Sequence, residues 1–294
     1  MYKVILWGFG NCYNLMKNTI AYFEITKQLE VVCIAASDKY MEVLDDYRVI
    51  YPCDIREEEY DYIFVMSDKY FDDIVEIGTK KYGIDRKKMI SFKILQIPQL
   101  NLKDYFTLYE SDITIVSNNC WGGCIYNTLG MECQSPFKNL FLNDDDYIKV
   151  YSNLKYYMEK SLVMSHYAVD LHAGNEYPVL LLEDIEIHCN HADNVQQAID
   201  DWERRKAKIN WSNVYYEMST NDKVMANKFL KTLDGKNGIC FVPWKANEEK
   251  MLHIEQAPGQ KYYWEAITGN ATLGTYGLKY SLVDLLLGKK RLRY

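Results

Sequence analysis

The densest group of titratable side chains occupies residues 183–191. If the apolar positions of this stretch face a core, Glu186 and His188 share the opposite face of one strand, with Cβ atoms about 7 Å apart. That spacing suits an acid–base pair or a shared metal ion, so Glu186 and His188 are candidate catalytic residues. Asp184 and His191 can join them from the strand ends. A polar edge strand without chemistry is the alternative.

A polar, glycine-rich stretch at residues 117–123 lies between a predicted strand and a short predicted helix. Ligands of open α/β sheets bind beyond the carboxyl ends of the strands. Backbone N–H groups at the start of a helix suit a phosphate or carboxylate. The candidate anion-binding residues are therefore Ser117, Asn118, Asn119, Cys120, Trp121, Gly122 and Gly123. A tight turn with structural glycines is the alternative.

Cys120 offers a different chemistry at the same place. A thiol at a helix N-terminus can have a lowered pKa and act as the nucleophile of a Cys-dependent hydrolase. Such an enzyme needs His166, His172 or His188 within hydrogen-bond reach of the thiol, and none is near it in sequence. Cys120 and Cys124 alone lack further ligands at zinc spacing, so no metal site is predicted from them.

Two charged segments suit a diphosphate. Asp144–Asp146 contains the Asp-x-Asp spacing that can hold Mg²⁺ or Mn²⁺ on a nucleotide-sugar. Three acidic residues before a helix also favour its N-terminus, which is the alternative. Arg204 and Arg205 are candidates to neutralise phosphate; a solvated helix face with i,i+4 ion pairs is the alternative and the commoner use of such residues.

The start of the chain carries a candidate nucleotide-binding turn. Gly8 and Gly10 follow the first predicted strand, where a phosphate turn would lie, and Asp38 follows the second strand, where an acidic residue would meet a ribose. The third glycine of the dinucleotide fingerprint is absent, since Tyr13 occupies its position. A similar module that binds no dinucleotide is the alternative.

The elements that must position these residues alternate between strands and helices. Continuous apolar strands separated by helices predict a parallel sheet covered on both faces. A segment with Pro98 and no periodicity divides the chain, and we place the boundary between residues 1–101 and 102–294. The first segment is predicted to have strands at Lys3–Trp7, Val31–Ala36, Asp61–Met66 and Lys88–Phe92, and helices at 11–30 and 70–82, with Gly83 ending the latter.

The second segment is predicted to be another α/β domain, with a mixed sheet and a less regular alternation. Its predicted strands are 112–117, 179–182, 185–189, 213–218 and 238–242. Its predicted helices are the short one up to residue 129, then 147–160, 193–208, 222–233 and 278–287.

Composition narrows the class of protein. The 294 residues are 48% hydrophobic and 26% charged, which excludes a disordered chain or a coiled coil. A net charge of −7 argues against a nucleic-acid partner. Eight cysteines, mostly single and in apolar runs, are typical of reduced thiols. No apolar run approaches the ~20 residues of a membrane span and no signal peptide precedes the first strand, so we expect a cytoplasmic protein.

Several motifs resemble a bacterial family associated with exopolysaccharide or surface-polysaccharide biosynthesis, whose domain has no assigned function. The resemblance covers roughly residues 112–245. It rests on Ser117–Gly123, Tyr126, Ser135–Phe137, Asp146–Tyr147, Leu182–His188 and the helix that contains Trp202–Lys206. It implies a role in surface-glycan assembly and supplies no reaction or catalytic residue. The first segment resembles, more weakly, the Rossmann-like modules that precede various sugar-processing proteins.

The expectation is a Rossmann-like domain followed by a second α/β domain, acting on a sugar or nucleotide-sugar. Its transferase-like site would lie between the domains and would need residues 117–123 to converge with Glu186 and His188 on one hollow. A non-catalytic sugar- or nucleotide-binding or assembly module, and a Cys-dependent hydrolase, are the alternatives.

Overall fold

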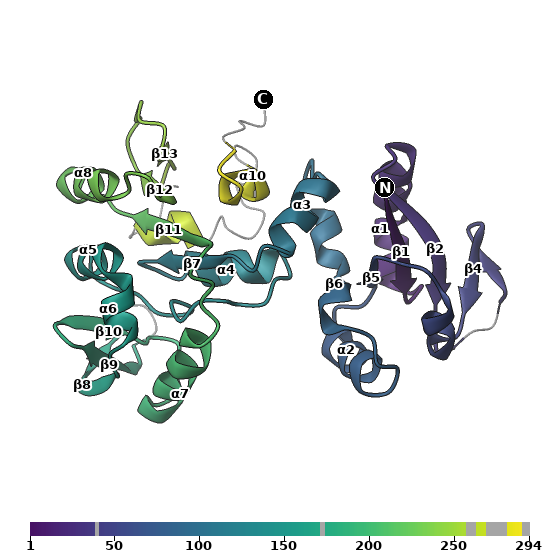
Figure 1. Cartoon of the computed structure of the whole chain (residues 1–294), viewed down its shortest axis with the longest axis horizontal. Helices are drawn as coiled ribbons and strands as arrows, with labels where there is room; N and C mark the ends of the chain where they lie inside the picture. Colours follow the sequence, from purple (N-terminus) through teal and green to yellow (C-terminus); the bar gives the residue numbers. More distant parts are fainter. Residues whose placement is uncertain (39–40, 171–173, 257–262, 269–280, 290–294) are drawn as a thin grey trace. The chain divides into compact units, whose positions relative to one another are not determined.

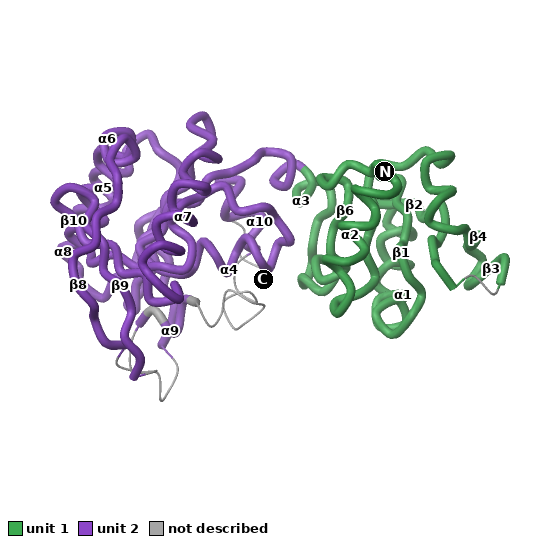
Figure 2. The backbone as a smooth tube through the Cα atoms, turned by 90° about the horizontal axis from the view of Figure 1, so that it is seen from below, with its two compact units in different colours: residues 1–106 green, residues 107–294 purple. Residues whose placement is uncertain are grey.

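A computed structural model describes residues 1–38, 41–170, 174–256, 263–268 and 281–289 (Figure 1). The chain folds into two compact units (Figure 2). Unit 1 comprises residues 1–106 and unit 2 comprises residues 107–294. The sequence-based boundary was placed after residue 101. Each unit has its own sheets and core.

Unit 1 is built on one six-stranded sheet in the order β3-β4-β2-β1-β5-β6. All its pairings are parallel except that of the edge strand β3 with β4. Parallel strands continue in both directions from β1, which is the doubly wound arrangement, so the predicted Rossmann-like class is confirmed. The strands are β1 (Tyr2–Trp7), β2 (Leu29–Ala35), β3 (Val43–Leu44), β4 (Tyr47–Ile50), β5 (Tyr62–Val65) and β6 (Met89–Ser91).

Two of these strands, β3 and β4, were not predicted. Asp45 and Asp46 have φ of 47° and 70°, and they join Leu44 to Tyr47 in a two-residue hairpin turn of the kind that needs positive φ at both positions. Strand β4 then pairs in parallel with β2 and buries Val49. The segment is short and charged, so its alternation does not stand out in the sequence.

The helices of unit 1 follow its strands. Gly83 has φ of 62° and its N–H donates to the carbonyl of Thr79, which ends α2 as predicted. The helices are α1 (Asn11–Ile25) and α2 (Phe71–Lys80), with 3₁₀ turns at Pro52–Glu57, Arg86–Lys88 and Phe92–Gln96. Helix α3 (Leu102–Tyr109) continues into unit 2.

Unit 2 has the predicted α/β class and carries its strands in two sheets. A parallel sheet has the order β13-β12-β11-β7, and an antiparallel sheet has the order β10-β9-β8. The parallel strands are β7 (Thr114–Ser117), β11 (Val214–Ser219), β12 (Asn237–Val242) and β13 (Met251–His253). The antiparallel strands are β8 (Val163–Val169), β9 (Glu176–Leu182) and β10 (Ile185–His188). Of these, β8 and β13 were not predicted.

Several helices of unit 2 begin at an N-cap residue whose side chain accepts a hydrogen bond from the first turn. The Asn194 side chain accepts a hydrogen bond from the N–H of Gln197, and that of Asp222 accepts from Val224 and Met225. The helices are α4 (Trp121–Thr128), α5 (Asp144–Ser152), α6 (Leu154–Met158), α7 (Val195–Lys206), α8 (Lys223–Thr232), α9 (Tyr263–Thr268) and α10 (Leu282–Leu286). Part of the helix predicted at 278–287 lies outside the described residues.

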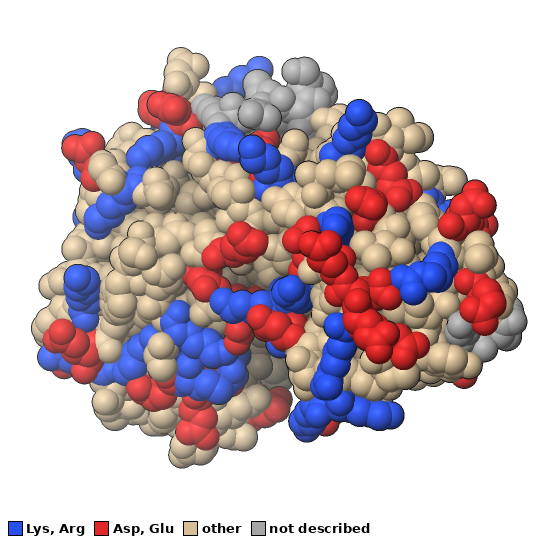
Figure 3. Space-filling view, turned by 45° about the vertical axis from the view of Figure 1, so that its right-hand side comes forward, with Lys and Arg blue, Asp and Glu red and all other residues tan. Residues whose placement is uncertain are grey.

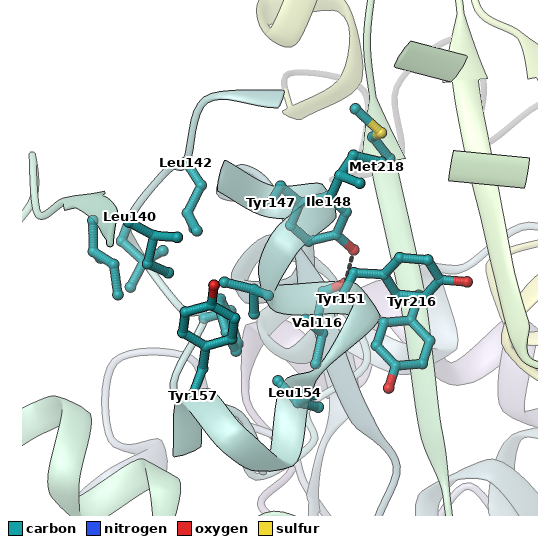
Figure 4. Close-up of a cluster of buried hydrophobic side chains, with 14 of the residues drawn as sticks. Val116, Leu140, Leu142, Tyr147, Ile148, Tyr151, Leu154, Tyr157, Tyr216 and Met218 are labelled. Atoms are coloured by element: carbon teal, nitrogen blue, oxygen red, sulfur yellow. Dashed lines mark hydrogen bonds between the residues drawn. The ribbon is translucent and has the colours of Figure 1, made fainter. Parts of the chain in front are cut away.

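An aromatic core joins the two sheets of unit 2 (Figure 4). Tyr147 of α5 is fully buried, and its hydroxyl donates to the carbonyl of Val116 in β7 at 2.7 Å. Tyr216 and Met218 of β11 belong to the same cluster. Because strand side chains alternate, this core fixes Ser117 and Glu217 on the opposite face of the parallel sheet. Among the described residues of the chain, no helix is long and apolar enough to cross a membrane.

Candidate functional site

A buried polar cluster occupies the carboxyl ends of β7 and β11. These strands pair in parallel, with Ser117 in register with Glu217. We define the polar cluster as Ser117, Asn118, Asn119, Asp144, Glu217, Ser219 and Thr220, six of which are at least nine-tenths buried. It lies where open parallel sheets place their ligands.

Asn118 connects the strand ends. Its Nδ2 donates to Asp144 Oδ1 at 3.2 Å and to the Ser219 carbonyl at 3.1 Å. Its Oδ1 accepts from the Ser219 N–H at 3.0 Å and from Asn119 Nδ2 at 3.0 Å. An amide side chain has two donors and two acceptor positions, so all of Asn118 is used within the protein.

Two N–H groups at the start of α4 also have partners within the protein. Asn119 Oδ1 accepts from the N–H of Trp121 at 2.7 Å, and Ser117 Oγ accepts from the N–H of Gly122 at 3.3 Å. Ser117 Oγ also donates to the Asn119 carbonyl. These side chains take up two N–H groups that an anion would otherwise use, and the anion-binding role of this stretch stays a prediction.

The two glycines of the stretch allow close packing. A Cβ on Gly122 would lie 2.9 Å from Ser117 Oγ and 3.1 Å from Ile115 Cγ2. A Cβ on Gly123 would lie 3.1 Å from both Asn139 Oδ1 and Lys138 Cγ. The fully buried Trp121 packs against Phe241, with ring centroids 5.5 Å apart. The lack of a side chain at Gly122 thus lets α4 pack closely against β7. The lack of one at Gly123 lets residues 138–139 pack closely against α4.

Cys120 does not have the properties of an activated nucleophile. Its Sγ lies 3.9 Å from the Leu140 carbonyl, and burial raises the pKa of the thiol to about 12. The expected lowering of this pKa is wrong, because desolvation outweighs the helix terminus. His166 and His188 lie on the antiparallel sheet, and His172 lies outside the described residues.

Glu217 is the residue of this cluster that the sequence analysis missed. It is fully buried, Ser219 Oγ donates to its Oε1, and the Asn119 side chain also hydrogen bonds to its carboxyl group. Its Oε2 is buried without a hydrogen-bond partner among the described residues. Burial raises the pKa of Glu217 to about 8, so the carboxyl is mostly protonated at neutral pH. A glutamate inside the apolar strand Val214–Ser219 was the available signal.

The three acidic residues of the Asp-x-Asp motif point to different partners. Asp144 accepts from Thr220 Oγ1 at 2.5 Å, and burial raises its pKa. Asp145 pairs with Lys228, whereas Asp146 Oδ2 accepts from the N–H of Glu186 at 3.1 Å. Within the described part of the chain, no group of three His, Cys, Asp or Glu side chains could hold a metal ion. The motif therefore joins α5 to its neighbours.

Glu186 and His188 lie on β10 and share a face, as predicted. His188 stacks on Phe141 at 4.3 Å, its Nδ1 lies 3.3 Å from Tyr177 Oη, and burial lowers its pKa. The Glu186 carboxylate lies 3.8 Å from His166 Nδ1 on β8. These partners differ entirely from those of the polar cluster.

Residues 117–123 are connected to His188 through Phe141 and Leu142, and their convergence with Glu186 and His188 on one hollow stays a prediction. Phe141 pairs with the backbone of His188, and the N–H of the next residue, Leu142, donates to the Asn118 carbonyl. Residues 140–142 thus run between the two groups. The two groups belong to different sheets, so no strand pairing places Glu186 and His188 beside residues 117–123.

Arg204 and Arg205 converge on Asp201 within α7. Arg204 Nη2 lies 2.5 Å from Asp201 Oδ1, and Arg205 Nη2 lies 2.7 Å from Oδ2. The Arg204 side chain is 58% exposed, whereas that of Arg205 is 14% exposed and lines a small pocket with Lys138. Within the described part of the chain, neither arginine has a hydrogen bond to the polar cluster.

Comparison with known proteins gives the family. A family model described as "Domain of unknown function (DUF1919)" matches residues 91–276, and one described as "C2185-like, N-terminal" matches residues 1–90. The chain belongs to the DUF1919 family. Over 136 residues, 46% of this chain, it is 29% identical to an uncharacterised protein of Haemophilus influenzae. That match spans 63% of the relative's length. The polar cluster lies entirely inside the DUF1919 region.

The glycine turn of unit 1 falls in the C2185-like region. Gly8 has φ of 110° and its N–H donates to Ala35 at 2.8 Å, so glycine is required there by the backbone. Gly10 has φ of −78°, a Cβ added to it would meet no described atom within 4 Å, and Asp38 is exposed. Tyr13 is buried and donates to Asp45 Oδ2 at 2.9 Å. The predicted cofactor role of Gly8, Gly10 and Asp38 stays a prediction.

Proposed function

We propose that unit 2 acts on a sugar or nucleotide-sugar in surface-polysaccharide assembly, as a transferase whose proton donor is Glu217. The motif resemblance of residues 112–245 supports the biological setting. The location of the polar cluster supports a site there, since it occupies the carboxyl ends of two parallel strands, where ligands of such sheets bind.

The observation that carries the proposal is the unpartnered Oε2 of Glu217. Buried carboxyl groups are normally hydrogen-bonded, and an orphaned one with a displaced pKa is typical of a functional site. Because the Ser219 hydroxyl donates to Oε1, the proton of the neutral acid belongs on Oε2. Oε2 would then give this proton to a leaving or bridging oxygen of the substrate.

Glu217 has no exposed surface, so the substrate must displace a neighbouring segment to reach Oε2. Asn118, Asn119 and Ser117 keep a positioning role: they hold Ser219 and the carboxyl in place. Mg²⁺ or Mn²⁺ stays a predicted cofactor that a diphosphate would bring with it.

The test is a transfer assay on the full chain with UDP- and GDP-sugars and Mn²⁺, read as nucleotide release. Glu217→Gln keeps the size and the neutral state of the side chain, so we expect it to fold and to lose about 10²-fold or more of the rate. Glu132→Gln, which changes an exposed carboxylate of the same unit, is the matched control. Equal rates in the two variants would refute the proposal.

A non-catalytic binding or assembly module, in which residues 117–119 are purely structural, is the second candidate. The observation that favours it is that the side chains of Ser117, Asn118 and Asn119 all have hydrogen-bond partners within the protein. Under this alternative a sugar nucleotide shifts the melting temperature without any nucleotide release, and Glu217→Gln leaves the shift unchanged.

A further inference from the structure

A small pocket in unit 2 lies outside the polar cluster. Its lining includes Lys138 and Asn139 from the segment before α5, His191 from the turn after β10, and Asp201, Trp202 and Arg205 from α7. The segments come from three separate parts of the chain, so the pocket is a product of the fold. Asn139 has φ of 60°, a conformation that asparagine tolerates better than most residues.

Positive charge exceeds negative charge at this pocket. Asp201 is shared by Arg204 and Arg205. Lys138 Nζ has a neutral hydrogen-bond partner, Asn127 Oδ1, at 3.5 Å. Among the described residues, the one carboxylate that lines the pocket therefore stands against two positive charges, those of Lys138 and Arg205.

Two thiols near the pocket lie within electrostatic reach of its positive charges. Lys138 and Arg205 both act to lower the pKa of Cys133, against the larger effect of burial, which raises it. Arg205 acts in the same direction on the pKa of Cys189, a pocket residue. The surface as a whole is different: the net charge is −7, and on the face in Figure 3 patches of Lys and Arg are bordered by Asp and Glu.

Two hydrogen bonds within the protein fix the Arg205 side chain. Its Nη1 donates to the Lys138 carbonyl at 3.1 Å and its Nη2 to Asp201, which fixes the guanidinium at the pocket wall. A guanidinium has five N–H donors, so it keeps further donors after these two bonds. A fixed guanidinium, together with a second cationic residue in the lining of the same pocket, matches the charge and the acceptor oxygens of a phosphate group.

We propose that this pocket binds a phosphate group through Arg205 and Lys138, with Trp202 and Asn139 forming its walls. Gly123 is part of the arrangement, because a side chain there would push the 138–139 segment away from α4. The proposal does not depend on Glu217 or on sugar transfer.

The experiment is titration calorimetry of the full chain with inorganic phosphate and, in separate arms, with a sugar 1-phosphate and a nucleoside monophosphate. We expect phosphate to bind and its affinity to fall as the salt concentration rises. If the natural ligand is a sugar phosphate, the sugar 1-phosphate should bind more tightly than inorganic phosphate and the nucleoside monophosphate. Arg205→Met should weaken binding by about tenfold or more, since charge-assisted hydrogen bonds contribute on that scale.

Two variants keep the test decisive. Lys138→Met removes a cation whose hydrogen bond is to a neutral amide, so the protein should fold normally and bind phosphate several-fold more weakly. Arg204→Met removes the other arginine on Asp201, which does not line the pocket, and should leave binding within about twofold. No binding at about 10 mM phosphate, or an equal loss in Arg204→Met and Arg205→Met, would overturn the proposal.

Discussion

The reactivity of individual cysteine thiols tests the hypothesis that the protein is a Cys-dependent hydrolase. The pKa of Cys120 is raised to about 12 by burial, and Cys53 is exposed although its hydrogen bond to Asp54 raises its pKa too. Alkylation needs an accessible thiolate. We therefore expect iodoacetamide at pH 7 to label Cys53 well before Cys120 in the native chain, measured by peptide mass spectrometry. Faster labelling of Cys120 would restore the nucleophile hypothesis.

At this scale the sequence indicated which side chains were polar and near a strand end, but not which atoms remained available. Asn118 and Asn119 lie at the carboxyl end of β7, as expected, yet their amides are occupied by Ser219, Asp144 and Trp121. Glu217 was missed because an apolar strand with one carboxyl looks like a strand with one exposed position. Only the neighbouring strands show that this position is buried.

The junction of α4 with β7 carries a prediction at the scale of the element. Alanine is normally favoured over glycine in a helix by about 1 kcal/mol. Gly122→Ala should nevertheless destabilise the protein by about 1–3 kcal/mol, because the new Cβ meets Ser117 Oγ at 2.9 Å. Urea unfolding measures this.

Gly10→Ala is the control for that substitution. Gly10 is the N-cap of α1, with open space around its missing Cβ, so alanine meets no clash there and should cost about 1 kcal/mol or less through the weaker cap. A Gly122→Ala variant as stable as Gly10→Ala would show that α4 does not need its close approach to β7.

Elements with a strong apolar period were predictable, and those held by tertiary contacts were not. Strands β1, β2, β5, β11 and β12 were placed by continuous apolar runs that are buried in parallel sheets. Strand β8 was missed because it lies at a sheet edge with most of its side chains exposed. The helix predicted over 147–160 is interrupted at Asn153, whose φ of −142° is not helical.

For the molecule as a whole, the sequence predicted two α/β parts, but it could not show that unit 2 divides its strands between two sheets. Strand content does not specify pairing, and the hypothesis of one hollow depended on pairing. The connection through Phe141 and His188 is a contact over 47 residues that no local pattern encodes.

The buried acid of unit 2 predicts how stability depends on pH. The pKa of Glu217 is about 8 in the folded chain against an ordinary value of 4.5. The folded state therefore holds a proton that the unfolded chain releases above pH 4.5, so stability is lost as pH rises from about 4.5 to about 8, by up to about 1.4 kcal/mol per unit. Glu217→Gln removes this contribution.

The difference in unfolding free energy between the wild type and Glu217→Gln isolates the group, measured by urea unfolding from pH 5 to pH 8. Asp144, with a raised pKa, and His188, with a lowered one, are present in both proteins and largely cancel. As pH rises from 5 to 8, we expect the unfolding free energy of the wild type to fall relative to that of Glu217→Gln by up to about 4 kcal/mol. A flat difference would mean that Glu217 is ionised in the folded protein. Oε2 would then carry no proton, and the transfer reaction would lose its donor.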